Sequence, residues 1–338
     1  MELAITGASG FIGSHVVVQA LAKGYKVRLL TRSKLNREDW YNQNVTFFYG
    51  DVRDSKSLIP FLEGADFLCH VAGVNTPSSN QRDNIFSSNV EGVRQILSVA
   101  QAVGVKKIVV TSSTAAIGCR GRGQMNDETV EFNLWNASTD YERSKYLGEK
   151  VAWEFYREKG LPVIIVAPSA CVGPGDVKPT YTGKLILDLV HRRLPGYFDM
   201  RHNFVDVRSV AEGHLLALEK GQIGQKYLLC GDDNILMSEY FNMISAMTGV
   251  PVPKLKLPLW LVFPLAYGFH LLWLVTKKDP LIRVSTVKRA WLDLYYSNQK
   301  AKRELGFCPG PLKKALFDEL VWFQSAGYIK VDLHIRQI

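Results

Sequence analysis

Short apolar, β-branched runs alternate with segments of helical periodicity through the first half of the chain. Such runs are typical of strands buried on both faces, and helices between them are typical of parallel pairing. In the intervening segment 85–102, apolar residues including Ile85, Val93 and Ile96 recur at helical spacing. The rhythm predicts an α/β fold built on a doubly wound parallel sheet. The predicted strands are residues 3–6, 26–30, 45–48, 67–70, 107–111 and 163–166.

The rhythm breaks after Pro168, where Gly173-Pro174-Gly175 and Pro179 predict an irregular crossing segment. A further strand, residues 226–229, is expected to return to the sheet. We therefore expect a nucleotide-binding domain of residues 1–167, which residues 200–230 rejoin. A smaller, mostly helical C-terminal substrate lobe would comprise residues 168–199 and 231–338, a division that suits a chain of 338 residues.

Residues 257–275 form the most apolar stretch, with a length close to that of a membrane span. Pro258, Pro264, Gly268 and His270 interrupt it. We favour a buried wall of the substrate pocket, while a peripheral membrane contact and a true span remain the alternatives. The basic residues that flank the stretch are Lys254, Lys256, Lys277 and Lys278.

Charge and cysteine content limit which ligands and partners are expected. The net charge is +9, but Lys and Arg are scattered, which favours a solvated basic surface and anionic small ligands over nucleic acid. The 5 cysteines are widely spaced with no Cys-x-x-Cys pair, so neither disulfides nor a zinc site is expected. Met1 leads directly into a predicted strand, so we expect no signal peptide. We expect a cytoplasmic protein, with membrane association left open, and a homodimer as one assembly.

The sharpest motif is Gly7-Ala8-Ser9-Gly10-Phe11-Ile12-Gly13, which follows the first strand and opens a helix. Glycines here allow a tight turn, close approach of the backbone to a pyrophosphate, and close packing of helix on strand. The helix N-terminus faces the phosphates. The motif predicts a Rossmann dinucleotide site contacted by Gly7, Ser9, Gly10, Phe11, Ile12 and Gly13.

The end of the second strand bears on the choice of cofactor. An acidic residue there accepts hydrogen bonds from the ribose of NAD, but this chain has Thr31-Arg32-Ser33-Lys34. Arg32 would pair with a 2′-phosphate. NADP(H) is therefore the preferred cofactor and NAD the second choice. The alternative is that Arg32 is an ordinary solvated strand-end residue.

The Gly-x-x-Gly-x-x-Gly spacing resembles the short-chain dehydrogenase/reductase superfamily, and later motifs resemble its extended branch over nearly the whole chain. Within that branch the sequence looks most like the group of dihydroflavonol reductases, 3β-hydroxysteroid dehydrogenases and hopanoid-associated sugar epimerase-like proteins. The motifs are Asp51-Val52, His70-Val71-Ala72-Gly73, Asn89, Ser112-Ser113, Tyr141-Glu142-Arg143-Ser144-Lys145, Asn203-Phe204-Val205-Asp206-Val207 and Glu304-Leu305-Gly306-Phe307.

The resemblance implies catalysis by Ser113, Tyr141 and Lys145. Ser113 is chosen over Ser112 because the family's catalytic hydroxyl lies five residues before the glycine that matches Gly118, and Thr114 is the fallback. Further cofactor contacts are implied at Asp51, Val52, Val71, Ala72, Gly73, Asn89, Ser112, Tyr141, Lys145, Pro168 and Val172.

Tyr141 and Lys145 are four residues apart, so on a helix they share one face. A nearby ammonium can lower the pKa of a phenol from about 10 by roughly 1 to 3 units. Lys145 can also hold ribose hydroxyls, while Ser113 hydrogen-bonds the carbonyl oxygen that Tyr141 protonates. His70 is expected to be a hydrogen-bonded histidine, with no metal, and Asp127-Glu128 a solvated turn rather than a catalytic pair.

Three functions compete. The favoured one is an NADP(H)-dependent reductase or dehydrogenase acting on a hydrophobic, dihydroflavonol- or hydroxysteroid-like molecule. A nucleotide-sugar epimerase is the alternative, and a non-catalytic NADP-sensing protein is the third. Thr114 and Ala115 stand where sugar dehydratases of the superfamily carry an Asp-Glu pair, which disfavours dehydration.

Overall fold

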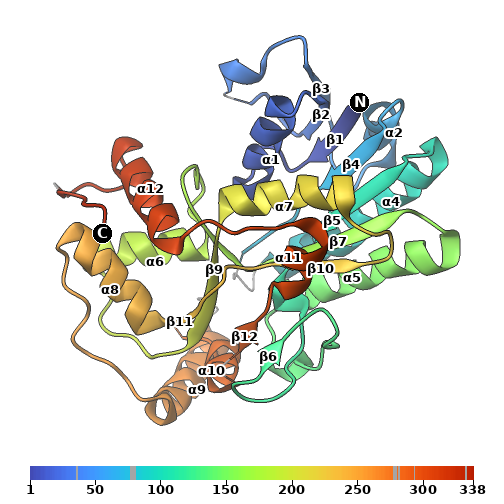
Figure 1. Cartoon of the computed structure of the whole chain (residues 1–338). Helices are drawn as coiled ribbons and strands as arrows, with labels where there is room; N and C mark the ends of the chain where they lie inside the picture. The colour runs from blue at the N-terminus through green and yellow to red at the C-terminus, as the bar shows by residue number, and fades with distance from the viewer. Residues whose placement is uncertain (36, 77–80, 277–279, 281, 293, 332) are drawn as a thin grey trace.

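A seven-stranded parallel sheet forms the centre of the computed structural model, in the order β10-β7-β5-β4-β1-β2-β3 (Figure 1). The structure describes residues 1–35, 37–76, 81–276, 280, 282–292, 294–331 and 333–338. The predicted parallel α/β architecture is confirmed, and each predicted strand lies in this sheet. The strands are β1 (Glu2–Thr6), β2 (Lys26–Thr31), β3 (Val45–Tyr49), β4 (Phe67–His70), β5 (Lys107–Thr111), β7 (Val163–Pro168) and β10 (Lys226–Leu229).

Helices cover both faces of the sheet. Side chains alternate along a strand, so Leu3 and Ile5 pack with α1 (Phe11–Ala22) and α7 (Val207–Lys220). Ala4, between them, faces the opposite core. The helices of that second face are α2 (Ser55–Leu62), α4 (Gly92–Val103) and α5 (Asp140–Lys159). Burial on both faces explains why the strands read as apolar runs.

The helix expected over residues 85–102 contains a wider turn. It begins as α3 (Arg82–Phe86), passes through one π-helical turn η3 (Ser87–Glu91) and continues as α4 to the left-handed Gly104. Such turns inside helices often occur at functional sites. Here the turn carries the buried Asn89.

The rest of the chain builds a second lobe around a three-stranded sheet of order β11-β9-β8. Its strands are β8 (Ala170–Val172), β9 (Arg201–Asp206) and β11 (Asn234–Leu236), and α6 (Tyr181–Val190), α8 (Met237–Thr248) and α12 (Leu312–Ser325) share its apolar core. Of residues 200–230, β9 thus lies in the small sheet, while β10 joins the large one.

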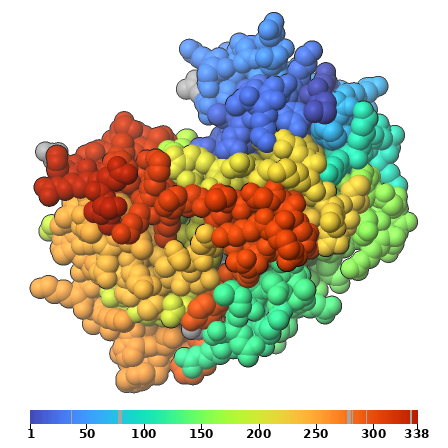
Figure 2. Space-filling view, in the orientation of Figure 1, coloured from blue at the N-terminus to red at the C-terminus, as the bar shows by residue number. Residues whose placement is uncertain are grey.

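Segments from the end of the chain return to the first domain. β12 (Tyr295–Tyr296) pairs in parallel with β6 (Met125–Asn126), and α11 (Gln299–Leu305) packs on α7 and β10. In Figure 2, α7 and α11 lie along the face where the two lobes meet. The lobes therefore interleave in sequence.

The prediction that residues 257–275 are buried is wrong, while their role as a wall of the substrate pocket stays a prediction. They contain α9 (Leu259–Thr276), of which only Val262 and Ala266 are buried, against Val287 of α10 (Val284–Leu292). Among the described residues, α9 is a helix that is long enough and apolar enough to cross a membrane, judged by length and composition alone. Apolarity in the sequence did not reveal which sides of the helix have a partner.

Candidate active site

The loops that follow β1, β2, β3, β4 and β5 meet at the carboxyl edge of the large sheet, where open α/β sheets bind ligands. The first of these loops requires glycine at specific positions. Gly7 has a φ of +74°, and a Cβ added to Gly13 would lie 2.1 Å from the Gly7 carbonyl oxygen. A Cβ on Gly7 would lie 2.7 Å from the amide nitrogen of Ala72. The loop therefore packs tightly on both α1 and the β4 loop.

The start of α1 is open to a ligand. Gly10 is its N-cap residue and supplies no side-chain cap, while Ser9 and Gly10 are exposed and Phe11 and Ile12 are half-buried. The first backbone N–H groups of a helix lack partners within it and attract anions. This uncapped helix start in a glycine cradle fits the pyrophosphate of a dinucleotide.

Thr6 ties the β1 and β4 loops together. Its hydroxyl accepts hydrogen bonds from the amides of Val71 (3.2 Å) and Ala72 (3.1 Å) and pairs with Nδ1 of His70 at 2.9 Å. Burial, helped by the charge of Lys145, lowers the pKa of His70 to about 3. His70 is therefore a neutral hydrogen-bonded histidine, as predicted.

A cation lies at the end of β2. The Arg32 side chain is exposed and forms no hydrogen bond or ion pair with the described part of the chain. It lies near Asp51, whose pKa is lowered mainly by its hydrogen bonds with Arg53 (2.7 and 2.8 Å), with a smaller contribution from Arg32. An unpaired guanidinium thus stands where NAD-binding folds place an acid.

Asn89 fastens the β4 loop to the helix that carries the predicted catalytic pair. Its side-chain oxygen accepts a hydrogen bond from the Val74 amide (2.7 Å), and its nitrogen donates to the Val74 carbonyl (3.0 Å) and to Ser144 (2.9 Å). A Cβ added to Gly73 would lie 3.1 Å from Asn89 Oδ1 and 3.7 Å from Lys145 Nζ. Val52, in turn, packs against Gly92 at the start of α4.

Local sequence fixes the start of α5. Thr139 and Glu142 form a capping box, in which Glu142 accepts the Thr139 amide at 2.6 Å. Tyr141 and Lys145 follow within the first two turns, and both side chains are half-buried. The predicted helix therefore places both residues on one face, toward the end of β5.

Ser113 reaches the phenol of Tyr141. It has extended backbone after β5 and accepts the Ala115 amide at 3.1 Å, and its hydroxyl lies near enough to Tyr141 to lower the pKa of the phenol. The neighbouring Ser112 instead donates to Glu149 at 2.7 Å, and Thr114 is buried. Of the three hydroxyls considered from the sequence, the structure brings Ser113 to the tyrosine.

The ionisation of Tyr141 differs from the sequence-based expectation. Burial raises its pKa to about 12, although the Ser113 hydrogen bond acts in the opposite direction. Lys145 Nζ donates to the Thr111 carbonyl at 2.7 Å, and burial lowers its own pKa to about 8. The expected lowering of the tyrosine pKa by Lys145 is wrong here, because desolvation of the phenolate is the largest effect and Glu142 also raises the pKa.

Glu149 is a site-supporting residue that the sequence analysis missed. Its buried carboxylate accepts hydrogen bonds from Ser112, from Lys226 Nζ (2.6 Å) and from Trp153 (3.3 Å). Its charge also raises the pKa of Lys145, against the larger effect of burial. The available signal was its position four residues after Lys145 on the same helix.

The remaining predicted residues have structural surroundings of their own. Pro168 ends β7 beside Leu229 of β10, and Val172 is fully buried in the core of the second lobe. Their cofactor contacts stay predictions.

The two acidic residues of the predicted solvated turn differ in their surroundings. Asp127 pairs with Arg120 at 2.9 Å, whereas Glu128 accepts the Leu228 amide at 2.8 Å, and burial raises the pKa of Glu128. Glu128 is therefore a fastening group rather than a solvated turn residue.

A glycine cradle on a parallel sheet, with a serine, a tyrosine and a lysine at its carboxyl edge, defines a nicotinamide-dependent enzyme of the extended short-chain dehydrogenase/reductase type. The chain belongs to the NAD dependent epimerase/dehydratase family, whose model matches residues 3–230.

Known proteins resemble the chain over nearly its full length. It is 36% identical to a putative dihydroflavonol 4-reductase of Synechocystis, covering 97% of this chain and 96% of that protein. It is 33% identical to sterol demethylase protein B of Methylococcus capsulatus, with coverages of 97% and 100%. The solved structure of gox2253 has a TM-score of 0.87 at 38% identity and covers 97% of this chain and 99% of that chain.

Proposed function

We propose that the protein is a reductase that uses freely exchanging NADPH to reduce a carbonyl group of a hydrophobic small molecule. The observation that carries the proposal is the exposed Arg32 at the end of β2, unpaired within the described residues. A guanidinium there can form charge-assisted hydrogen bonds with a 2′-phosphate. Epimerases of the superfamily keep a tightly held NAD, whose ribose an acid at this position would bind.

The protonation states of the site also support reduction. When bound, the nicotinamide supplies a hydride for the carbonyl carbon. Tyr141 holds its proton over a wide pH range, since its pKa is about 12, and can deliver that proton to the carbonyl oxygen. Ser113 orients the same oxygen, and Lys145 holds the ribose hydroxyls. The product is an alcohol, and the site needs no further acid or base.

The chemical class of the substrate is inferred from two full-length relatives. One carries the name of a dihydroflavonol reductase and the other that of a sterol demethylase protein. Polyphenolic ketones and 3-ketosteroids are both rigid and largely apolar. We therefore expect a ring ketone of this kind as substrate.

The proposal is tested by incubating purified protein with NADPH and a panel of dihydroflavonols, 3-ketosteroids and nucleotide sugars, with absorbance at the nicotinamide band as the readout. Consumption of NADPH with a ring ketone, and little with NADH, is expected. Protein that purifies with stoichiometric bound NAD and interconverts nucleotide sugars without added cofactor would instead be an epimerase.

A further inference from the structure

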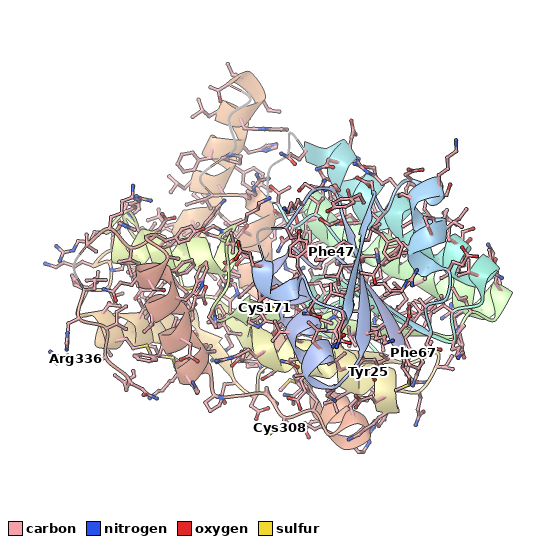
Figure 3. The ribbon with its side chains drawn as sticks, turned by 90° about the horizontal axis from the view of Figure 1, so that it is seen from above. Tyr25, Phe47, Phe67, Cys171, Cys308 and Arg336 are labelled. Atoms are coloured by element: carbon pink, nitrogen blue, oxygen red, sulfur yellow. The ribbon has the colours of Figure 1, made fainter. Side chains whose placement is uncertain are left out.

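α9 presents a large apolar surface to solvent. Eight of its large apolar side chains are exposed, and for three of them the exposure is high: Trp260 is 70% exposed, Leu271 63% and Val275 83%. No residue of α9 beyond Ala266 is buried. In Figure 3 the helix stands out from the body of the molecule. Large exposed apolar patches mark surfaces that contact a partner or a membrane.

The exposed residues form one continuous stripe. Leu261, Leu265, Leu272 and Val275 recur at intervals of three, four or seven residues, so they share one side of α9, turned away from Val262 and Ala266, which pack on α10. We define the outer stripe of α9 by its exposed apolar members Trp260, Leu261, Leu265, Leu271, Leu272 and Val275.

Charge indicates what covers this stripe. The helix contains no Asp, Glu, Lys or Arg, whereas Lys254 and Lys256 precede it and Lys277 and Lys278 follow it directly in the sequence. Lys254 and Lys256 are exposed, and Lys256 also pairs with Asp199 of the body of the protein. An apolar helix with basic residues at both ends suits the acyl boundary of a bilayer whose headgroups are anionic. Trp260 lies near one end, and tryptophan favours the membrane interface.

We infer that α9 attaches the protein to the surface of an anionic phospholipid bilayer, with the outer stripe immersed and the helix lying along the interface. A transmembrane crossing would pull Val262 and Ala266 away from Val287, and the chain returns to the body in α10. This inference does not depend on the proposed reaction.

The attachment side of the molecule is connected to the catalytic helix. Arg289 of α10 pairs with Glu142 at 3.1 Å, and Glu142 directly follows Tyr141 in α5. Lys288, also in α10, donates to the Asn136 carbonyl at 3.4 Å, just before α5. A bilayer under α9 would therefore lie on the side of the molecule where α10 contacts the start of α5.

The test is cosedimentation of the full chain with vesicles of phosphatidylcholine alone and of phosphatidylcholine with about one third phosphatidylglycerol. We expect binding to the anionic vesicles, at least tenfold weaker binding to the neutral ones, and weakening by added salt, as electrostatic attraction requires. The triple variant Leu271→Glu/Leu272→Glu/Val275→Glu should lose binding at least tenfold, because three apolar side chains that would enter the bilayer become charged.

A matched control carries the same charge change elsewhere. Val18→Glu/Ile59→Glu/Ile223→Glu replaces three exposed apolar residues of the first domain and should bind vesicles like the native protein. Far-UV circular dichroism spectra that match that of the native protein show that both variants are folded. Equal vesicle binding by the α9 variant and the native protein would overturn the inference. So would a native dimer that binds no vesicles and that the α9 substitutions convert to a monomer, since the stripe would then be an interface between copies.

Discussion

Replacing Glu149 by glutamine is expected to change both the stability of the protein and the ionisation of Lys145. Glu149 and Lys226 form an ion pair at 2.6 Å with side chains only 6% and 12% exposed. Removing one partner of a buried pair costs about 3 to 5 kcal/mol, because the other charge remains buried. Glutamine keeps the shape of the side chain and can still accept the Ser112 hydrogen bond, so we expect a loss near 3 kcal/mol in the free energy of unfolding.

The same substitution should shift the pH dependence of cofactor binding. Burial lowers the pKa of Lys145 to about 8, and the negative charge of Glu149 opposes that effect. Without the charge, the pKa of Lys145 falls further. NADPH binding weakens as pH rises through this pKa, since the ammonium that holds the ribose is lost. The variant should therefore lose affinity at a lower pH than the native protein.

Stability should show the linked effect of Lys145. Its folded-state pKa of about 8 lies below the ordinary value of 10.5, so between these values the unfolded chain binds more protons. Stability therefore gains from this group as pH rises from about 8 toward 10.5, and its burial penalty is present in full below about pH 8.

Two further variants separate the effect on stability from the effect on the pH dependence of cofactor binding. Glu149→Gln/Lys226→Met removes the unpaired ammonium and should recover most of the stability, yet retain the shifted pH profile. Glu154→Gln makes the same chemical change on the same helix, in an exposed pair with Arg94, and should leave the free energy of unfolding nearly unchanged without shifting the profile. The assays are urea denaturation and NADPH fluorescence titration between pH 7 and 10. A Glu149→Gln protein with the native pH midpoint would refute the reasoning.

Four further outcomes are expected. Arg32→Ala should weaken NADPH binding about tenfold to a hundredfold and leave NADH nearly unchanged in titrations, since it removes one charge-assisted contact. Tyr141→Phe should reduce turnover by about 10² to 10⁴ with cofactor binding intact, whereas Lys145→Ala should impair both; a Phe variant above a tenth of the native rate would exclude Tyr141 as the acid. Gly13→Ala should abolish NADPH binding and lower the melting temperature, because its Cβ would lie 2.1 Å from a carbonyl oxygen. Cys308, the exposed cysteine at the surface in Figure 3, should react first with a thiol reagent, and Cys308→Ser should remove that fast phase.

The sheet could be predicted because its strands are buried on both faces and therefore read as apolar runs. Residues 107–111 and 226–229 have the expected bounds. β7 is longer than predicted and ends at Pro168, which can occupy the last position of a strand because no further ladder donor is needed there. The small sheet was missed because β8 and β11 are only three residues each and lack alternation.

The catalytic group of residues was partly predictable for a similar reason. The four-residue spacing of Tyr141 and Lys145 determines a shared helix face whatever surrounds it. The direction of the Tyr141 pKa shift was not predictable, because it depends on burial by segments distant in sequence. The same holds for Glu149, whose partner Lys226 lies 77 residues away. Sequence spacing thus identifies neighbours within one helix, but not the groups that set their ionisation.

α5 is the element through which the distant parts of the molecule act on the site. Its first turn carries Tyr141, and Glu142 pairs there with Arg289 of α10. One turn later Lys145 contacts the end of β5, and a further turn later Glu149 contacts Lys226 at the start of β10. Each contact fixes the rotation of the helix about its axis from a different side. A small rotation of α5 would move the phenol, the ammonium and the buried carboxylate together, so disturbance of either the α10 or the β10 contact should affect catalysis through the same geometry.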